Sequence, residues 1–197
     1  EERLAHSVKK ILMSKYIVGL HKYQPVVVSS LIQDLNTERD DIVYENAISK
    51  SITVLKNSKG ILPIQNLETK KIAYVELGDD SGEVFFNELN KYTKVDRVKG
   101  TKLDGLLKSL ESYNTVIIGL HRSNDNPWKS YQLKERELTW LYEIARKHDV
   151  IFDGFVRPYM LDQLKTIKNF EGILMSYQNS EWSQKVSAQI IFGARDA

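Results

Sequence analysis

The chain has 197 residues, of which 42% are hydrophobic and 27% are charged, close to the average for globular proteins. This length suits one large domain, or one domain with a small appendage. The formal net charge is +2, from 28 basic and 26 acidic residues, and this balance argues against nucleic-acid binding, which needs a concentrated basic face. The chain has no cysteine for disulfide or thiolate chemistry, and no apolar run approaches the roughly 20 residues of a membrane-spanning helix.

The first fifty residues have the pattern of helices. Apolar residues recur every three or four positions over residues 4–12, which predicts an amphipathic helix ending near Gly19. A second, short helix is expected over residues 25–35. Residues 37–40, Thr-Glu-Arg-Asp, resemble a capping box, so a third helix is expected from there to about Lys50. The charged, amphipathic start does not resemble a signal peptide, and we expect the chain to be a fragment of a longer one.

After Ser51 the pattern changes to strands that alternate with helices. Strands are predicted at 52–55, 71–77, 94–98, 115–120, 149–156 and 172–177, and helices at 83–91, 103–110, 133–148, 158–167 and 181–192. Nearly continuous apolar strands alternating with helices indicate a mostly parallel sheet covered on both faces. The predicted fold is therefore an α/β/α sandwich with five or six strands over residues 51–197, preceded by a helical segment over residues 1–50.

The segment 78–86, GDDSGEVFF, lies where α/β folds bind phosphate, between a strand and a helix. It matches neither glycine-rich phosphate-binding motif, and Asp79 and Asp80 would repel a phosphate. The simpler interpretation is a tight turn in which Asp80 or Ser81 caps the next helix. No nucleotide or other cofactor is expected.

The loop 120–131, LHRSNDNPWKSY, is the strongest candidate for a binding site. It follows a predicted central strand at the edge where open α/β sheets place ligands. His121, Arg122, Asp125, Asn126 and Trp128 could hydrogen-bond and stack a sugar or a peptide. The alternative is a surface loop whose tryptophan packs on the domain or on a neighbour.

Other chemistry has little support in the sequence. The four histidines lack the spacing of metal ligands, and G-x-S-x-G does not occur, so no metal site and no serine nucleophile are expected. Glu135, Glu137 and Glu143 have the positions of the solvent-exposed side of a helix. The helix that begins near Glu181 is expected to be capped by Asn179 or Ser180.

Four segments, taken in order, resemble the C-terminal domain of glycoside hydrolase family 3. Residues 2–20 are similar to the helix that leaves the catalytic barrel in that family, and residues 45–64 to the connection into its second domain. Residues 172–193 look like its closing strand and helix. Residues 150–161, VIFDGFVRPYML, are similar to the strand and Pro-Tyr-x-Leu turn of the β-N-acetylglucosaminidase branch. The resemblance extends over essentially the whole chain.

The resemblance implies that the catalytic residues lie elsewhere. In the family, the nucleophilic aspartate belongs to an N-terminal (β/α)8 barrel, and in the N-acetylglucosaminidase branch the proton donor does too. The β-glucosidase-like branch has its acid/base glutamate in a loop corresponding to residues 120–131, where this chain has Asp125 and no glutamate. The resemblance therefore favours the first branch and assigns no catalytic residue to this chain.

The expected function is that of a non-catalytic domain in an enzyme acting on cell-wall sugars. Its implied partners are a preceding barrel of the same polypeptide and the carbohydrate substrate, with His121, Arg122, Asp125 and Trp128 as candidates for the rim of the active site. Some bacterial members of the branch also look to be followed by a β-lactamase-like domain, and such relatives are exported, which suggests a periplasmic or extracellular location. A stand-alone sugar-binding or small-molecule-binding module and a flavodoxin-like enzyme remain alternatives.

Overall fold

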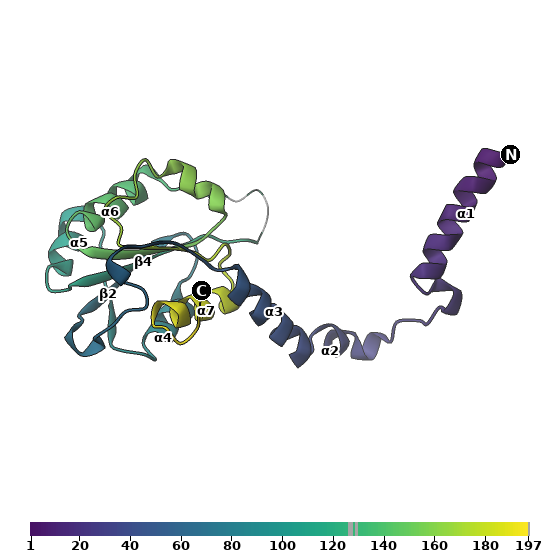
Figure 1. Ribbon diagram of the computed structural model, residues 1–197, viewed down its shortest axis with the longest axis horizontal. Helices are drawn as coiled ribbons and strands as arrows, with labels where there is room; N and C mark the ends of the chain where they lie inside the picture. The colour runs from purple at the N-terminus through teal and green to yellow at the C-terminus, as the bar shows by residue number, and fades with distance from the viewer. Residues whose placement is uncertain (126–127, 129, 197) are drawn as a thin grey trace. The chain divides into compact units, whose positions relative to one another are not determined.

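The structure, a computed structural model, describes residues 1–125, 128 and 130–196 (Figure 1). The chain divides into two compact units, Glu1–Asp41 and Ile42–Ala197. Helix α3 (Glu38–Ser51) has residues in both units. The domain boundary expected between residues 50 and 51 stays a prediction.

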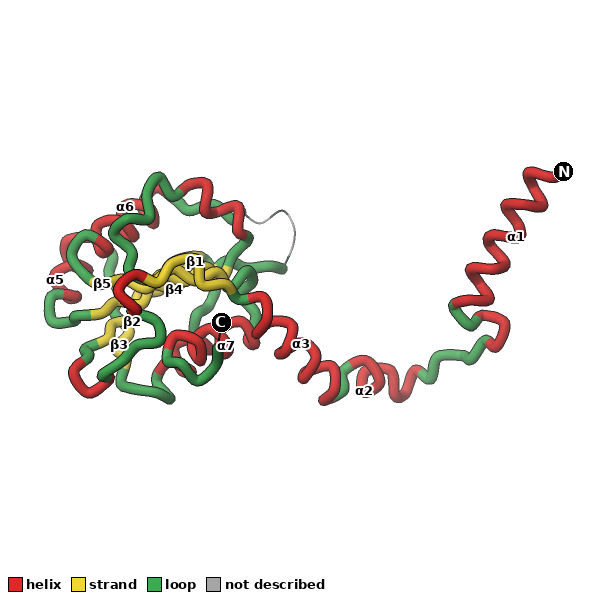
Figure 2. Tube along the Cα trace, viewed as in Figure 1, coloured by secondary structure: helices red, strands yellow, loops and turns green. Residues whose placement is uncertain are grey.

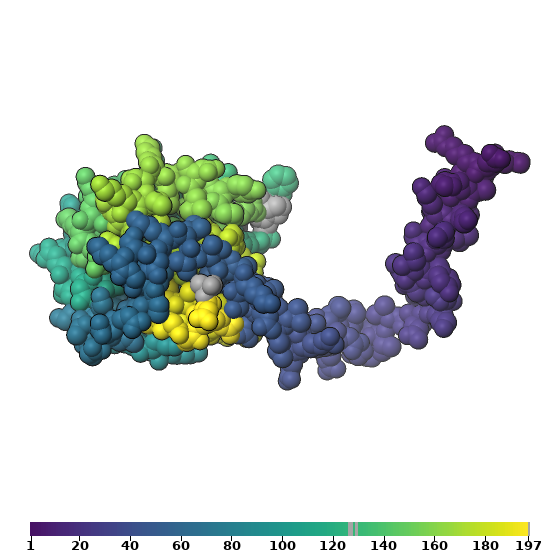
Figure 3. Space-filling view, viewed as in Figure 1, coloured from purple at the N-terminus to yellow at the C-terminus, as the bar shows by residue number. Residues whose placement is uncertain are grey.

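The first unit consists of helices and short turns, and its side chains are drawn in purple to dark blue in Figure 3. It contains α1 (Glu2–Ile17), the 3-10 turns η1 (Leu20–Lys22) and η2 (Val28–Ser30), and α2 (Leu31–Leu35). Gly19 follows α1 with φ +80°, a left-handed conformation that glycine adopts without strain, so the predicted helix end is confirmed. The second helical segment begins at Val28, three residues after the expected Pro25. Within this unit no side chain is buried.

The predicted capping box before α3 is confirmed. The Thr37 amide donates to Asp40 Oδ2 at 3.0 Å, and the Asp40 amide donates to Thr37 Oγ1 at 3.3 Å. Hydrogen bonds from Thr37 lower the pKa of the Asp40 carboxyl, because they favour its charged form. These reciprocal bonds satisfy two amides that the first turn of a helix cannot pair.

The second unit is built on one six-stranded sheet, shown in yellow in Figure 2. All six predicted strands are present: β1 (Thr53–Asn57), β2 (Ile72–Gly78), β3 (Val95–Arg97), β4 (Thr115–His121), β5 (Asp149–Phe155) and β6 (Gly172–Met175). Their order is β1-β6-β5-β4-β2-β3, and every neighbouring pair is parallel except β1 with β6. The fold class expected from the sequence is confirmed.

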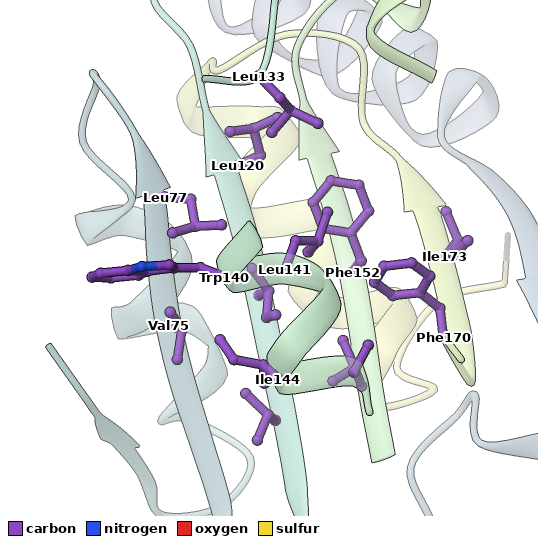
Figure 4. Close-up of a cluster of buried hydrophobic side chains, with 14 of the residues drawn as sticks. Val75, Leu77, Leu120, Leu133, Trp140, Leu141, Ile144, Phe152, Phe170 and Ile173 are labelled. Carbon is purple, nitrogen blue, oxygen red and sulfur yellow. The ribbon is translucent and has the colours of Figure 1, made fainter. Parts of the chain in front are cut away.

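Two layers of helices bury the two faces of this sheet. Helices α5 (Leu103–Leu110) and α6 (Glu135–Ala145) cover one face, and α4 (Glu83–Leu89) and α7 (Glu181–Ile191) cover the other (Figure 1). Successive residues of β4 alternate between the faces, so that Ile118 packs with α6 and Ile117 packs towards α7. Figure 4 shows Leu141 and Ile144 of α6 over the central strands. Each such buried side chain contributes roughly 1.5–3 kcal/mol to folding.

The segment after β5 differs from its prediction. A helix was expected over residues 158–167, but the structure has a 3-10 segment, Pro158–Gln163, and the chain is extended at Leu164. Met160 is the one buried residue of this segment. Without an apolar face repeating over several turns, a longer α-helix has no tertiary packing to stabilise it.

The strand order places a switch point between β2 and β4. From β2 the chain crosses to β3 on one side, and from β4 it crosses to β5 on the other. The order β3-β2-β4-β5-β6 is that of flavodoxin-like folds, in which ligands bind beyond the carboxyl ends of the strands beside such a switch point. The carboxyl ends of β2 and β4 are therefore the first place to look for a site.

Candidate functional site at the carboxyl edge of the sheet

His121, the last residue of β4, lies at the centre of this edge and is fully buried. Its Nε2 is 2.8 Å from the Tyr74 hydroxyl on the neighbouring strand β2, and its Nδ1 is 2.7 Å from Asn179 Oδ1 in the loop after β6. Its ring stacks on Phe155 with the centroids 4.5 Å apart. His121 thus links the end of β4 to the loop after β6, where Asn179 lies 58 residues further along the chain.

The hydrogen-bond network determines which nitrogen of His121 carries the proton. The Phe85 backbone amide donates to Gln184 Oε1 at 2.9 Å, so the other end of that side chain is the NH2 group. Gln184 Nε2 donates to Asn179 Oδ1 at 2.9 Å, so this atom of Asn179 is an acceptor. His121 Nδ1–H therefore donates to Asn179, and His121 Nε2 accepts from the Tyr74 hydroxyl.

Burial keeps both members of this pair neutral. It lowers the pKa of His121 to about 4 and raises the pKa of Tyr74 well above its usual value. Two glycines leave room for the pair: a Cβ at Gly82 would lie 2.1 Å from the Tyr74 hydroxyl oxygen, and one at Gly119 would lie 2.4 Å from His121 Nε2. This arrangement makes His121 a structural link between β2, β4 and the loop after β6. Its expected role at an active-site rim stays a prediction.

Arg122 is also buried and forms a charged pair with Glu137 of α6. Its Nη2 donates to the Glu137 carboxylate and, at 2.9 Å, to the Gln132 carbonyl. Glu137 also accepts from the Lys134 amide at 2.7 Å, which caps α6. The expectation that Glu137 lies on the solvent-exposed side of its helix is therefore wrong, because this carboxylate neutralises a buried guanidinium.

The remaining loop candidates lie on the surface. Asp125 is exposed, and its amide donates to Ser123 Oγ at 3.3 Å. Trp128 is 90% exposed. Asn126, which the sequence also suggested, lies outside the described residues. The structure thus separates the four rim candidates into a buried pair, His121 and Arg122, and an exposed pair, Asp125 and Trp128.

The loop after β2 is a closed turn, as the simpler interpretation predicted. The second part of that interpretation is wrong, because the N-cap residue of α4 is Gly82 and not Asp80 or Ser81. The amides of the turn already have acceptors within the protein: those of Asp79 and Asp80 donate to the His121 carbonyl, and those of the next three residues donate to Asp80 Oδ1, Glu76 Oε1 and Ser81 Oγ. A phosphate-binding loop needs such amides free to point at the ligand. The strand order resembles that of flavodoxins, but this loop does not offer a phosphate site.

A fully buried acid in the central sheet was missed by the sequence analysis. Asp153, in the middle of β5, is fully buried and accepts hydrogen bonds from the hydroxyls of Ser176 and Ser187. Burial raises its pKa to about 7, although these bonds act in the opposite direction. The available signal was a charged residue inside the apolar strand sequence VIFDGF, at residues 150–155.

Two searches of the described residues bear on metal and membrane binding. No group of three or more histidine, aspartate or glutamate side chains in this part of the chain is arranged to hold a metal ion. Among the same residues, no helix has the length and apolar character needed to cross a membrane.

Comparison with solved structures identifies where this fold occurs. A family 3 β-N-acetylglucosaminidase from Paenibacillus sp. matches 100% of this chain with 38% of its own length, at 17% identity and a TM-score of 0.62. A β-glucosidase from Listeria innocua matches 93% of this chain with 29% of its own (16% identity, TM-score 0.68). A fungal multi-domain family 3 β-N-acetylglucosaminidase matches 88% of this chain with 20% of its own length, at 17% identity and a TM-score of 0.67.

The chain has the fold of one part of a family 3 glycoside hydrolase. The resemblance expected from the sequence is thus confirmed at the level of the fold. The chain spans only 20% to 38% of the length of these three proteins. No protein-family profile matches the sequence, and no curated protein matches it significantly.

Proposed function

We propose that this chain is the non-catalytic α/β portion of a family 3 glycoside hydrolase of the β-N-acetylglucosaminidase type, an enzyme acting on cell-wall sugars. One observation carries the proposal. The Paenibacillus β-N-acetylglucosaminidase contains this fold over the full length of the chain, but the match covers only 38% of that enzyme. The chemistry would then reside in the remainder.

Three acids near the carboxyl edge are engaged within the protein, which supports a non-catalytic role. Most glycosidases use two carboxyl groups that face the scissile bond from an accessible site. Here Glu137 is paired with Arg122, and Asp153 is sealed in the core with two serines. Glu76 accepts from the Gly82 amide at 3.2 Å and is therefore also engaged.

The apolar surface of the first unit supports a barrel as the partner. On α1, Leu4, Ile11 and Leu12 are each more than half exposed, at helical spacing. A helix with such a stripe is stabilised when the stripe packs against another element. We propose that this stripe packs against a preceding barrel of the same polypeptide.

The same proposal includes a β-lactamase-like domain after Ala197. It also includes a periplasmic or extracellular location.

Trp128 is the rim candidate with the clearest physical basis. Its ring is 90% exposed, and an exposed indole can stack on the apolar face of a sugar. The same observation favours a second candidate function, a stand-alone carbohydrate-binding module. In the first case the ring completes a cleft formed with the barrel, and in the second it binds sugar by itself.

A chromogenic N-acetylglucosaminide tests the absence of catalysis. We expect no turnover by the purified chain of 197 residues. Turnover that disappears when one of its own acids is substituted would contradict the proposal.

Calorimetry with N-acetylglucosamine oligomers separates the two candidate functions. A non-catalytic domain that needs its barrel should give no saturable heat on its own. Saturable heat that is lost in Trp128→Ala would instead establish a stand-alone binding module.

A further inference from the structure

A pocket of about 380 Å³ lies over the carboxyl half of β2, on the face covered by α5 and α6. It is lined by residues from four places: the end of β2, the segment after β3, α5, and the start and first half of α6. None of the four rim candidates lines it. It lies beside the switch point between β2 and β4, on the opposite face from the closed network of His121.

The floor of the pocket is apolar. Figure 4 shows the Trp140 ring over β2, beside Val75 and Leu77. Val98 and Leu106 complete the apolar lining. Small-molecule sites are cavities of about 300–1,000 Å³, and the volume of this pocket lies within that range, with polar as well as apolar groups in its lining.

The polar groups at its mouth include three cations. Lys99 and Lys134 are exposed, and neither forms an ion pair with any residue that the structure describes. Arg136 lies over the Trp140 ring with its guanidinium carbon 4.2 Å from the ring centroid, and its Nη2 donates to the Thr101 carbonyl at 3.2 Å. This stacking holds the Arg136 charge at the wall of the pocket.

The two acids that line the pocket do not neutralise these cations. Glu137 is paired with the buried Arg122. Glu76 accepts from the Gly82 amide, and its other oxygen lies 3.9 Å from Arg97 Nε. Arg97 also pairs with Glu83 and Arg122 with Asp79, so the excess positive charge comes from the lining itself, in which three cations outnumber two acids.

We propose that this pocket binds a small organic anion, in which a carboxylate or phosphate group is carried on a body the size of a monosaccharide. The anionic group lies against Lys99, Lys134 and Arg136, and the body lies on the apolar floor around Trp140. The proposal rests on this pocket alone and does not depend on the glycoside hydrolase assignment.

A titration with three sugars of one size tests the proposal. Glucose 6-phosphate, glucuronate and glucose are added to the ¹⁵N-labelled full chain at low ionic strength. Both anions should bind saturably, roughly tenfold more tightly than glucose, and more weakly at high salt because ions screen the lysines. The amide signals of Lys99, Gly100 and residues 134–140 should shift. The anion with the lower Kd identifies the carboxylate or the phosphate as the preferred group.

Matched lysine variants localise the effect. The double variant Lys99→Gln and Lys134→Gln should weaken anion binding roughly tenfold, because it removes two charged contacts. Lys108→Gln, on α5 but outside the pocket lining, is the control and should leave binding unchanged. The proposal is overturned if no anion binds, if glucose binds as tightly, or if the double variant binds the anions as the original chain does. Turnover of a glycoside by this chain would contradict the proposed function and leave this result untouched.

Discussion

The two faces of the sheet have opposite character at the same carboxyl edge. On the α4 and α7 face, His121, Tyr74, Asn179 and Gln184 satisfy one another in a closed network with no space between them. On the α5 and α6 face, the end of β2 borders an open pocket with cations in excess. Ligands bind where polar groups lack partners within the protein, and the four members of this network bond to one another. The comparison shows that the switch point of this fold can be blocked on one face and accessible on the other.

The largest effect is expected at Glu137, on the open face. Glu137→Ala removes the nearer of two carboxylates from the buried Arg122 guanidinium, which keeps only Asp79 Oδ1 at 3.5 Å, and should cost about 3 kcal/mol of unfolding free energy. Urea denaturation measures the loss. The double variant Arg122→Met with Glu137→Met should be more stable than the single one, because no buried charge remains. A single variant as stable as the original chain would show that the pair is dispensable.

On the α4 and α7 face, adding a methyl group next to the His121 network should lower the unfolding free energy by nearly as much. Gly82→Ala places a Cβ about 2.1 Å from the Tyr74 hydroxyl and should destabilise the chain by about 2–3 kcal/mol, because the Tyr74–His121 bond must move. Gly105→Ala, in α5, is a matched control with nothing within 4 Å of the new Cβ, and it should be neutral or stabilising by up to about 1 kcal/mol. Equal thermal midpoints for the two variants would argue against a tightly packed network.

The buried acid Asp153 should make stability fall as the pH rises. Its pKa is about 7 in the folded chain, above the usual 3.8, so between pH 4 and 7 the folded state holds a proton that the unfolded state has released. His121 acts in the opposite direction: its folded pKa of about 4 makes stability rise between pH 4 and 6.5. The contributions of these two groups should largely cancel up to pH 6.5.

Single substitutions separate these opposing slopes. In Asp153→Asn the unfolding free energy should rise from pH 4 to 6.5, by up to about 1.4 kcal/mol per pH unit for one proton. In His121→Gln it should fall from pH 4 to 7. Urea denaturation across this range measures both. If both variants keep the pH profile of the original chain, these two buried groups do not control its pH dependence.

The smallest effect is expected at the mouth of the pocket. Lys134→Gln should change the unfolding free energy by less than about 0.5 kcal/mol, because the exposed side chain has no ion pair among the described residues and the α6 cap uses its backbone amide. Thermal denaturation measures the change. A loss above 1 kcal/mol would mean that Lys134 serves the fold and is not available for a ligand.

The amino-acid sequence by itself determined the elements of this protein. Thr37 with Asp40 and Ser180 with Ser183 form their predicted caps, and each of the six apolar runs became a strand, because helix caps and hydrophobic periodicity are local properties. The segment 158–163 was the exception. Its proline and spacing suit a helix, and only the tertiary structure shows that too little of it is buried to stabilise one.

Tertiary structure alone decided which side chains meet at the carboxyl edge. Nothing local pairs His121 with Asn179, or shows that Glu137 is buried while its neighbour Glu135 is exposed. The pocket is likewise assembled from four segments that only the tertiary structure brings together. Sites of this kind depend on contacts between residues distant in the chain, and local patterns carry no information about which distant residue will supply a partner or leave a charge without one.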